Sequence, residues 1–120
     1  MEIAVAQQLK EAVTAHKKGN LSRAEGLYRD VLKVHPTGAV ANHNLGLIAI
    51  TMNQSEVALP LFKTALEANP SVELFWLSYI EALIAERQFD DAKRAIKKAK
   101  IKRVASETLK ILTQKLVSSK

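Results

Sequence analysis

The chain has 120 residues, enough for one domain with a modest hydrophobic core. Apolar residues make up 48% and charged residues 25%, as in an ordinary globular protein. There is no cysteine, which excludes disulfide bonds and thiolate zinc sites, and no stretch has the roughly 18 apolar residues that span a bilayer. We expect an all-α protein of the cytoplasm without a membrane partner, because glycine and proline are few and helix-forming residues are abundant.

The sequence repeats with a period of 34 residues. Ala24, Ala58 and Ala92 are separated by this period, and each precedes a large apolar residue by four positions. Pro36 and Pro70 share the period, and each ends an apolar helical pattern. A constant period of this length indicates stacked copies of one structural unit within a single domain, residues 1–120. The units are expected at about residues 5–38, 39–72 and 73–106.

The first unit, residues 5–38, is predicted to form two helices separated at Gly19-Asn20. In its second half, four apolar residues follow the spacing i, i+3, i+4, i+7 that places them on one helix face. These residues are Ala24, Leu27, Tyr28 and Val31. Asn20 precedes this pattern and is a suitable N-cap, because its side-chain oxygen can accept a hydrogen bond from the first helical turn.

The second unit, residues 39–72, repeats the pattern after a polar break at residues 53–55. Its apolar face consists of Ala58, Leu61, Phe62 and Ala65. Ser55 is the expected N-cap of the second helix. Pro60 falls early in that helix and is expected to weaken or kink its first turn, because it lacks a backbone donor.

The third unit, residues 73–106, contains a cluster of aromatic residues, Phe75, Trp76 and Tyr79, which we expect in the core. A polar break at residues 87–88 separates its two helices. Beyond it, Leu109, Leu112 and Leu116 form an apolar stripe that predicts a capping helix over about residues 106–117, with Ser106 as N-cap. Seven helices are expected in total.

These patterns resemble the tetratricopeptide repeat family, whose 34-residue helix–turn–helix unit follows W-x2-L-G-x2-Y…A-x3-F…P. The middle unit matches best, with Leu45-Gly46, Ala49, Ala58, Phe62, Ala65 and Pro70. The resemblance implies an α-solenoid of three antiparallel hairpins in a right-handed superhelix of about seven helices. It also implies a protein–protein interaction module rather than an enzyme.

No catalytic motif is present. His16, His35 and His43 lack the spacing of a metal-binding pair, and there is no nucleophile elbow, phosphate-binding loop or dinucleotide fingerprint. The adjacent Asp90 and Asp91 fall at the start of a predicted helix, where negative charge stabilises the helix dipole. We therefore expect no catalytic residue, no metal and no cofactor.

The resemblance also implies a binding groove lined by the first helix of each unit, which would hold a peptide or protein segment. The positions that correspond are Lys10, Val13, Lys17, His43, Asn44, Leu47, Thr51, Ser78 and Glu81. Asn44 stands where family members bind a peptide backbone, although it is equally suited to solvent or to a neighbouring turn. The positions of the family's carboxylate clamp hold Leu9, Val13, Leu74 and Ser78, which makes a clamp for chaperone tails doubtful, while Lys10 and Lys17 favour an acidic ligand.

The net charge of +6 includes a basic run over residues 93–103, on the second helix of the third unit. Its members are Lys93, Arg94, Lys97, Lys98, Lys100, Lys102 and Arg103. A solvated helix face is the favoured interpretation, because no aromatic residue interrupts the run. A patch for nucleic acid or for an acidic surface is the alternative.

Two further hypotheses concern the chain as a whole. Repeats of this type resemble those that precede catalytic domains of bacterial glycosyltransferases and sulfotransferases, where they present the acceptor. The chain would then be the N-terminal region of a larger enzyme. Three units are near the minimum for a stable stack, so a homo-oligomer formed through an exposed end is a further hypothesis.

Overall fold

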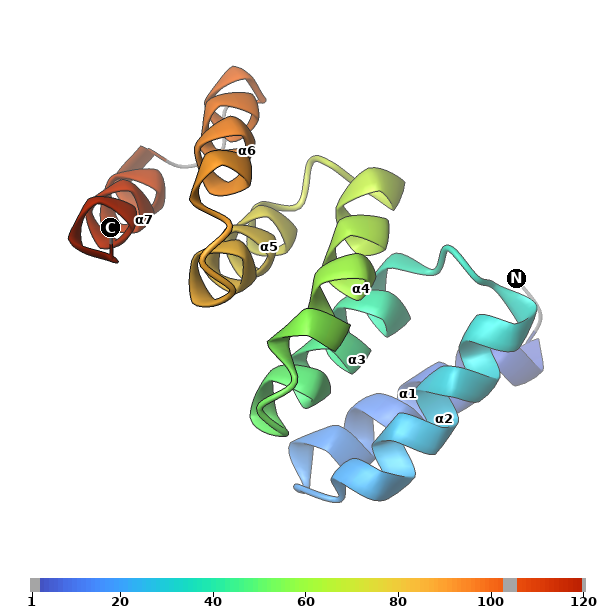
Figure 1. Ribbon diagram of the computed structural model, residues 1–120. Coiled ribbons are helices and arrows are strands. Elements are labelled where there is room, and N and C mark those ends of the chain that lie inside the picture. Colours follow the sequence, from blue (N-terminus) through green and yellow to red (C-terminus); the bar gives the residue numbers. More distant parts are fainter. Residues whose placement is uncertain (1–2, 103–105, 120) are drawn as a thin grey trace.

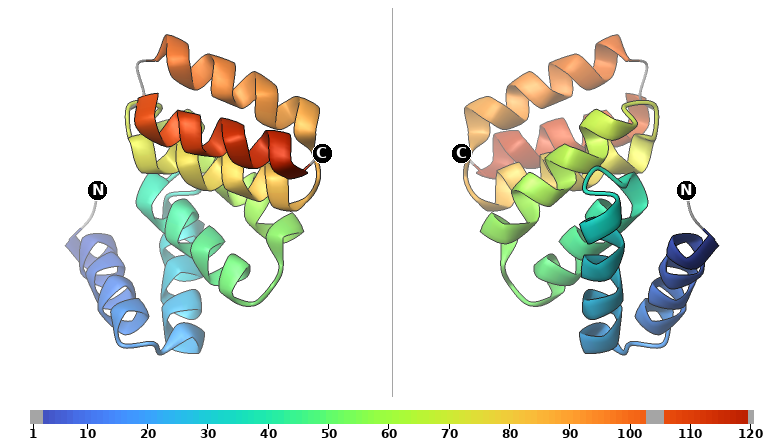
Figure 2. Two further views of the ribbon diagram at one scale, coloured as in Figure 1. Left: turned by 90° about the vertical axis from the view of Figure 1, so that its left-hand side faces the viewer. Right: turned by 90° about the vertical axis from the view of Figure 1, so that its right-hand side faces the viewer.

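The computed structural model describes residues 3–102 and 106–119, and this part of the chain forms seven α-helices (Figure 1). They are α1 (Ile3–Lys17), α2 (Leu21–Val34), α3 (Ala39–Thr51), α4 (Ser55–Ala68), α5 (Glu73–Ala85), α6 (Phe89–Ile101) and α7 (Ser106–Ser119). Consecutive helices pack against each other in antiparallel order, and α7 also packs on α5 (Figure 2). The all-α prediction and the predicted helix count are confirmed for the described residues.

The small residues of the repeat lie where helices approach most closely. Ala24, Ala58 and Ala92 are each 0% exposed, so nothing larger than a methyl group fits at the crossing. Gly46 on α3 has the same role toward α4, because a Cβ built on it would lie 2.7 Å from Phe62 Cδ1. The 34-residue spacing of small residues therefore reflects packing between the two helices of each unit.

The period of 34 also appears in the backbone of the turn inside each unit. Gly19, Asn53 and Arg87 occupy equivalent positions, and all three have positive φ angles, of 81°, 59° and 58°. In each turn, the residue with positive φ and the residue after it donate backbone hydrogen bonds to carbonyls of the preceding helix. This left-handed ending closes the first helix of every unit.

The helix starts follow the predictions only in part. The Asn20 side chain accepts a hydrogen bond from a backbone N–H in the first turn of α2, which confirms it as an N-cap. Ser55 is not an N-cap, which corrects the prediction. It is the first residue of α4, and Gln54 before it makes no side-chain cap bond. The Ser55 hydroxyl instead donates to Glu86 Oε2 at 2.7 Å, linking α4 to the end of α5.

Two further predictions concern single positions near helix starts. Helix α4 runs through Pro60 without ending, because the proline lies within its first two turns. Helix α7 begins at Ser106, in agreement with the expected capping helix, although the Ser106 side chain lies outside the described residues.

Side chains on α3 and α5 hold successive units together through a second repeated contact. Asn42 Nδ2 donates to the carbonyl oxygen of Pro36 at 3.0 Å, and Trp76 Nε1 donates to that of Pro70 at 2.7 Å. Both donors and both prolines are 34 residues apart. The proline that ends one unit thus presents its carbonyl to the first helix of the next.

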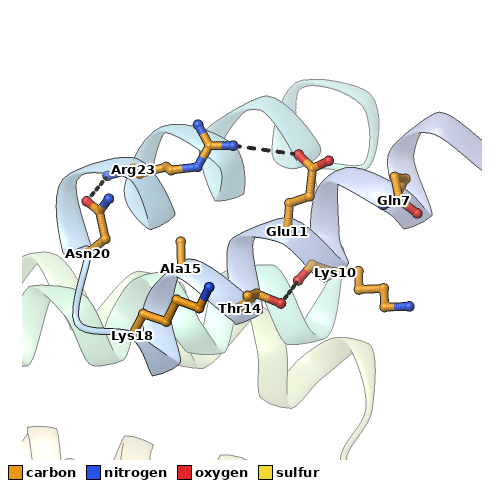
Figure 3. A pocket seen from close by; sticks show the side chains of 8 residues that line it. All are labelled: Gln7, Lys10, Glu11, Thr14, Ala15, Lys18, Asn20 and Arg23. Carbon is orange, nitrogen blue, oxygen red and sulfur yellow. Dashed lines mark hydrogen bonds and ion pairs between the residues drawn. The ribbon is translucent and has the colours of Figure 1, made fainter.

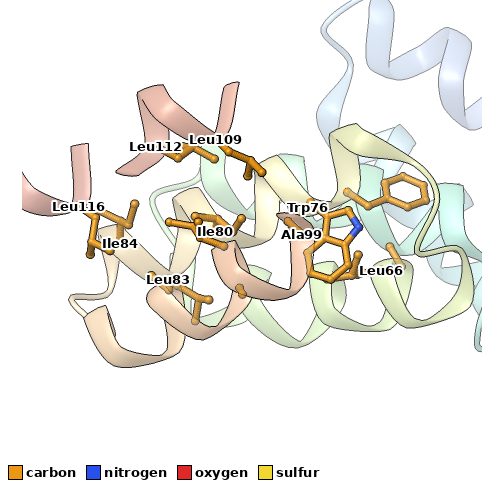
Figure 4. Close-up of a cluster of buried hydrophobic side chains, with 14 residues drawn as sticks. Leu66, Trp76, Ile80, Leu83, Ile84, Ala99, Leu109, Leu112 and Leu116 are labelled. Atoms are coloured by element: carbon orange, nitrogen blue, oxygen red, sulfur yellow. The ribbon is translucent and has the colours of Figure 1, made fainter. Parts of the chain in front are cut away.

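The buried core consists of three clusters. One lies in the N-terminal half around Tyr28 and Leu45, and a second joins α4, α5, α6 and α7 around Trp76 and Leu112 (Figure 4). The third lies between them, and its buried members are Ala49, Ala58, Phe62 and Ala82. Phe75 and Trp76 are buried as predicted, while Tyr79 is half-buried. No helix in the described ranges is long and apolar enough to cross a membrane.

Candidate binding groove

Three of the predicted groove residues come together in one surface depression. Leu47 on α3 and Ser78 and Glu81 on α5 line a cavity of about 190 Å³. The other lining residues are Ile50, Phe62, Ala82, Ala85 and Lys115. The depression therefore joins the second and third units, and α7 contributes to it through Lys115.

Asn44 is fixed by a hydrogen-bond network that connects the first two units. Its Nδ2 donates to Tyr28 Oη at 3.1 Å, and Tyr28 Oη is also hydrogen-bonded to His16 Nδ1 at 3.3 Å. Burial raises the pKa of Tyr28, and the hydrogen bond with Asn44 opposes that shift. The Asn44 side chain is only partly buried, so one N–H and its carbonyl oxygen still have hydrogen-bonding capacity for a ligand.

His43 has a different position from the predicted one. It is 2% exposed, and its ring packs against Phe62 and Phe75, with ring centroids 5.4 and 4.9 Å away. Its Nε2 forms a 2.7 Å hydrogen bond with Ser78 Oγ on α5. Burial lowers the pKa of His43, and a hydrogen bond from Asn44 opposes that shift. His43 is therefore a core residue that ties α3 to α5, and it presents no surface to a ligand.

The remaining predicted groove residues are spread along α1 and α3. Val13 is half-buried and packs on the N-terminal core cluster, whereas Lys17 is exposed at the end of α1. Thr51 is exposed at the end of α3, and its hydroxyl donates to the Leu47 carbonyl at 3.0 Å. Lys10 borders a separate polar depression of about 450 Å³ between α1 and α2 (Figure 3). These residues do not share the cavity of α3, α5 and α7.

The polar depression between α1 and α2 contains charges of both signs. Arg23 and Glu11 are 4.0 Å apart across it, and Lys18 and Thr14 complete its border (Figure 3). Both partners of this ion pair are largely exposed, so the pair adds little stability. It also shows no concentration of one charge that would select a ligand.

The basic run lies on the exposed side of α6, as predicted. Its described members are all exposed, namely Lys93, Arg94, Lys97, Lys98, Lys100 and Lys102, while Arg103 lies outside the described residues. Arg94 is paired with Asp91 on the same helix. Burial, followed by the charges of Asp91 and Glu67, raises the pKa of the nearby Tyr79. Nothing in this arrangement brings the lysines together around a cavity that they alone line.

Within the part of the chain that the structure describes, no three His, Asp or Glu side chains are grouped in a way that could hold a metal ion. Three groove residues escaped the sequence reasoning, namely Ile50, Ala85 and Lys115. Ile50 follows Leu47 by three positions on the same helix face, so helical spacing could have identified it. Lys115 had no such signal, because the placement of α7 does not follow from the repeat.

The sequence matches the profile described as "Tetratricopeptide repeat" over residues 49–116. The human protein "Tetratricopeptide repeat protein 7A" is 32% identical over 78 residues, which are 65% of this chain and 9% of that protein. The chain thus spans about a tenth of the length of this curated relative.

Solved structures of low sequence identity share the fold. The TPR2B domain of yeast Sti1, in a complex with pHsp70, has a TM-score of 0.86 and 16% identity, and covers 99% of this chain and 100% of that one. The first TPR of Spaghetti (RPAP3), bound to the HSP90 peptide SRMEEVD, has a TM-score of 0.77 and 17% identity, and covers 94% and 93%.

Proposed function

The chain belongs to the tetratricopeptide repeat family, and from this premise we propose that it binds an extended peptide or protein segment on the concave side formed by α1, α3 and α5. The repeat itself is a non-catalytic fold. The observation that carries the proposal is the depression at Leu47, Ser78 and Glu81, because it lies at groove positions of two successive units.

The state of Asn44 supports this proposal. Tyr28 Oη holds its amide from below at 3.1 Å, so the orientation of the amide is set before a ligand arrives. A side chain that is already ordered loses less conformational entropy on binding. Its remaining N–H and its carbonyl oxygen match the acceptor and donor of a peptide backbone.

The neighbouring structures agree with binding of this kind. Two of them are complexes whose titles name pHsp70 and an HSP90 peptide, and these ligands belong to those proteins. For this chain, the class of ligand is a segment of a partner protein. The groove residues of this chain set its chemistry.

A selection from displayed random peptides tests the proposal. The immobilised chain should enrich a set of peptides that bind about tenfold more weakly to a variant with Asn44→Ala and Glu81→Ala, because a hydrogen bond and a charge are lost. The matched control is Lys93→Ala with Lys97→Ala on α6, which should bind as the unchanged chain does. Circular dichroism confirms that both variants are folded. Equal binding to both variants would place the ligand outside the groove.

A further inference from the structure

The depression between α3, α5 and α7 has the size of one side chain. Its volume of about 190 Å³ is below the roughly 300–1,000 Å³ of small-molecule pockets. Much of its wall is apolar, formed by Leu47 and Ile50 from α3 and by Ala82 and Ala85 from α5. Ile50 is 40% exposed, so an aliphatic side chain that entered the depression would cover apolar surface now facing water.

The polar groups on α5 add a negative charge to this depression. The Ser78 hydroxyl is engaged with His43 Nε2 at 2.7 Å, so it is directed to the core. Glu81 is exposed, and no ion-pair partner for it is found within residues 3–102 and 106–119. Lys115, on the α7 side, is engaged in an interaction of its own. The charge left for a ligand to match is therefore that of the Glu81 carboxylate.

An acidic tail would find no complementary cation on α5. Leu74, which stands at a position of the carboxylate clamp, is 54% exposed and apolar. Ser78, at another of these positions, is bonded to His43. A carboxylate placed in this half of the groove would instead lie beside Glu81, and like charges repel. Charge complementarity thus favours a cationic group next to the apolar contact.

From these observations we propose that this half of the groove binds a segment of a partner protein in which an aliphatic residue stands beside a lysine or arginine. The aliphatic side chain fills the depression, and the basic side chain pairs with Glu81. This inference rests on the proposed groove function and adds the chemistry of the ligand. The overall charge of +6 works against a basic ligand, so a preference for one has to originate at this site.

The peptide selection described above supplies the first test. The enriched peptides should contain an aliphatic residue beside a lysine or arginine, and the peptide SRMEEVD should not displace them. If enriched peptides depend on the groove but lack this pair, or if SRMEEVD displaces them, the inference is wrong and the groove function stands. If no peptide is enriched over a blank surface, the proposed function fails, and the inference fails with it.

Variants of the depression supply the second test, on one enriched peptide by fluorescence anisotropy. Ala85→Leu fills the depression and should weaken binding about tenfold, because the aliphatic side chain loses its site. Ala68→Leu is the matched control, since Ala68 is likewise exposed at the end of a helix but does not line the depression. Glu81→Gln should weaken binding about two- to fivefold, with a smaller effect at high salt. Unchanged binding to both Ala85→Leu and Glu81→Gln would overturn the inference.

Discussion

The close approach of α3 and α4 at Gly46 can be tested by adding one methyl group. In Gly46→Ala, the new Cβ would lie 2.7 Å from Phe62 Cδ1 and 3.1 Å from Cζ. Carbon atoms in proteins normally pack at about 3.5–4.0 Å, so one of the two groups has to move. Phe62 is 1% exposed and packs on the ring of His43, which leaves it little room.

The expected cost follows from two opposing effects. Overpacking of a core costs about 1–3 kcal/mol, and the rigid surroundings of Phe62 place this site near the upper end. Alanine stabilises a helix interior by about 1 kcal/mol relative to glycine. The free energy of unfolding should therefore fall by about 2 kcal/mol in Gly46→Ala.

Gly26 provides a control for the same substitution. It is exposed within α2, and no heavy atom lies within 4 Å of a Cβ built on it. Only the helix propensity changes there, so Gly26→Ala should raise the free energy of unfolding by about 1 kcal/mol. The two variants should shift in opposite directions in urea denaturation followed by circular dichroism, with similar slopes.

A double variant connects the loss to Phe62 itself. In a Phe62→Leu background, Gly46→Ala should cost less than it does in the unchanged chain, because the smaller side chain leaves room for the methyl group. If Gly46→Ala is as stable as Gly26→Ala, the two helices do not approach as closely as described, and the packing argument is refuted.

Three more changes test other features of the fold. Asn20→Ala should lower the free energy of unfolding by about 1 kcal/mol in urea denaturation, because the N-cap bond of α2 is lost, whereas Gln54→Ala should have little effect. The pKa of His43 is lowered by burial, so the unfolded chain takes up a proton that the folded chain does not. Stability should therefore be full above the ordinary histidine pKa of about 6.5 and fall as the pH is lowered through it. Measurements at neutral pH and at about pH 5.5 should show a smaller fall in His43→Gln; an equal fall would contradict the argument. Arg87→Gly should raise the thermal midpoint slightly, because relief of about 1 kcal/mol of left-handed strain exceeds the roughly 0.5 kcal/mol of the exposed contact with Phe89. A lower midpoint would show that the strain is absent.

The sequence predicted the helices well because packing repeats with them. Ala24, Ala58 and Ala92 are buried where the 34-residue register places them, and the apolar stripe of α7 is buried through Leu109, Leu112 and Leu116. A residue spaced by a fixed period contacts equivalent neighbours in every unit, so period and burial carry the same information. The fold therefore needed no partner, ligand or metal to be identified.

The candidate site was harder to predict because groove positions differ in depth. His43 is equivalent to Leu9 and Leu77, which are 34 residues away on either side and pack on the core clusters. That column of leucines was the available signal that His43 is buried. Ser55 resembled an N-cap by residue type alone, but Glu86 attracts its hydroxyl from a helix that local sequence does not reveal.

The division of the core into three clusters has a mechanical consequence. Phe62 is the only large side chain among the buried members described for the middle cluster, which lies beneath the candidate groove. Burying one such ring contributes about 1.5–3 kcal/mol, so the joint between the two halves of the stack rests on little apolar surface. The curvature of the solenoid is thus most easily changed at this joint. A ligand lying across α3 and α5 would act there as a splint, and its grip would be felt as stiffness along the whole stack.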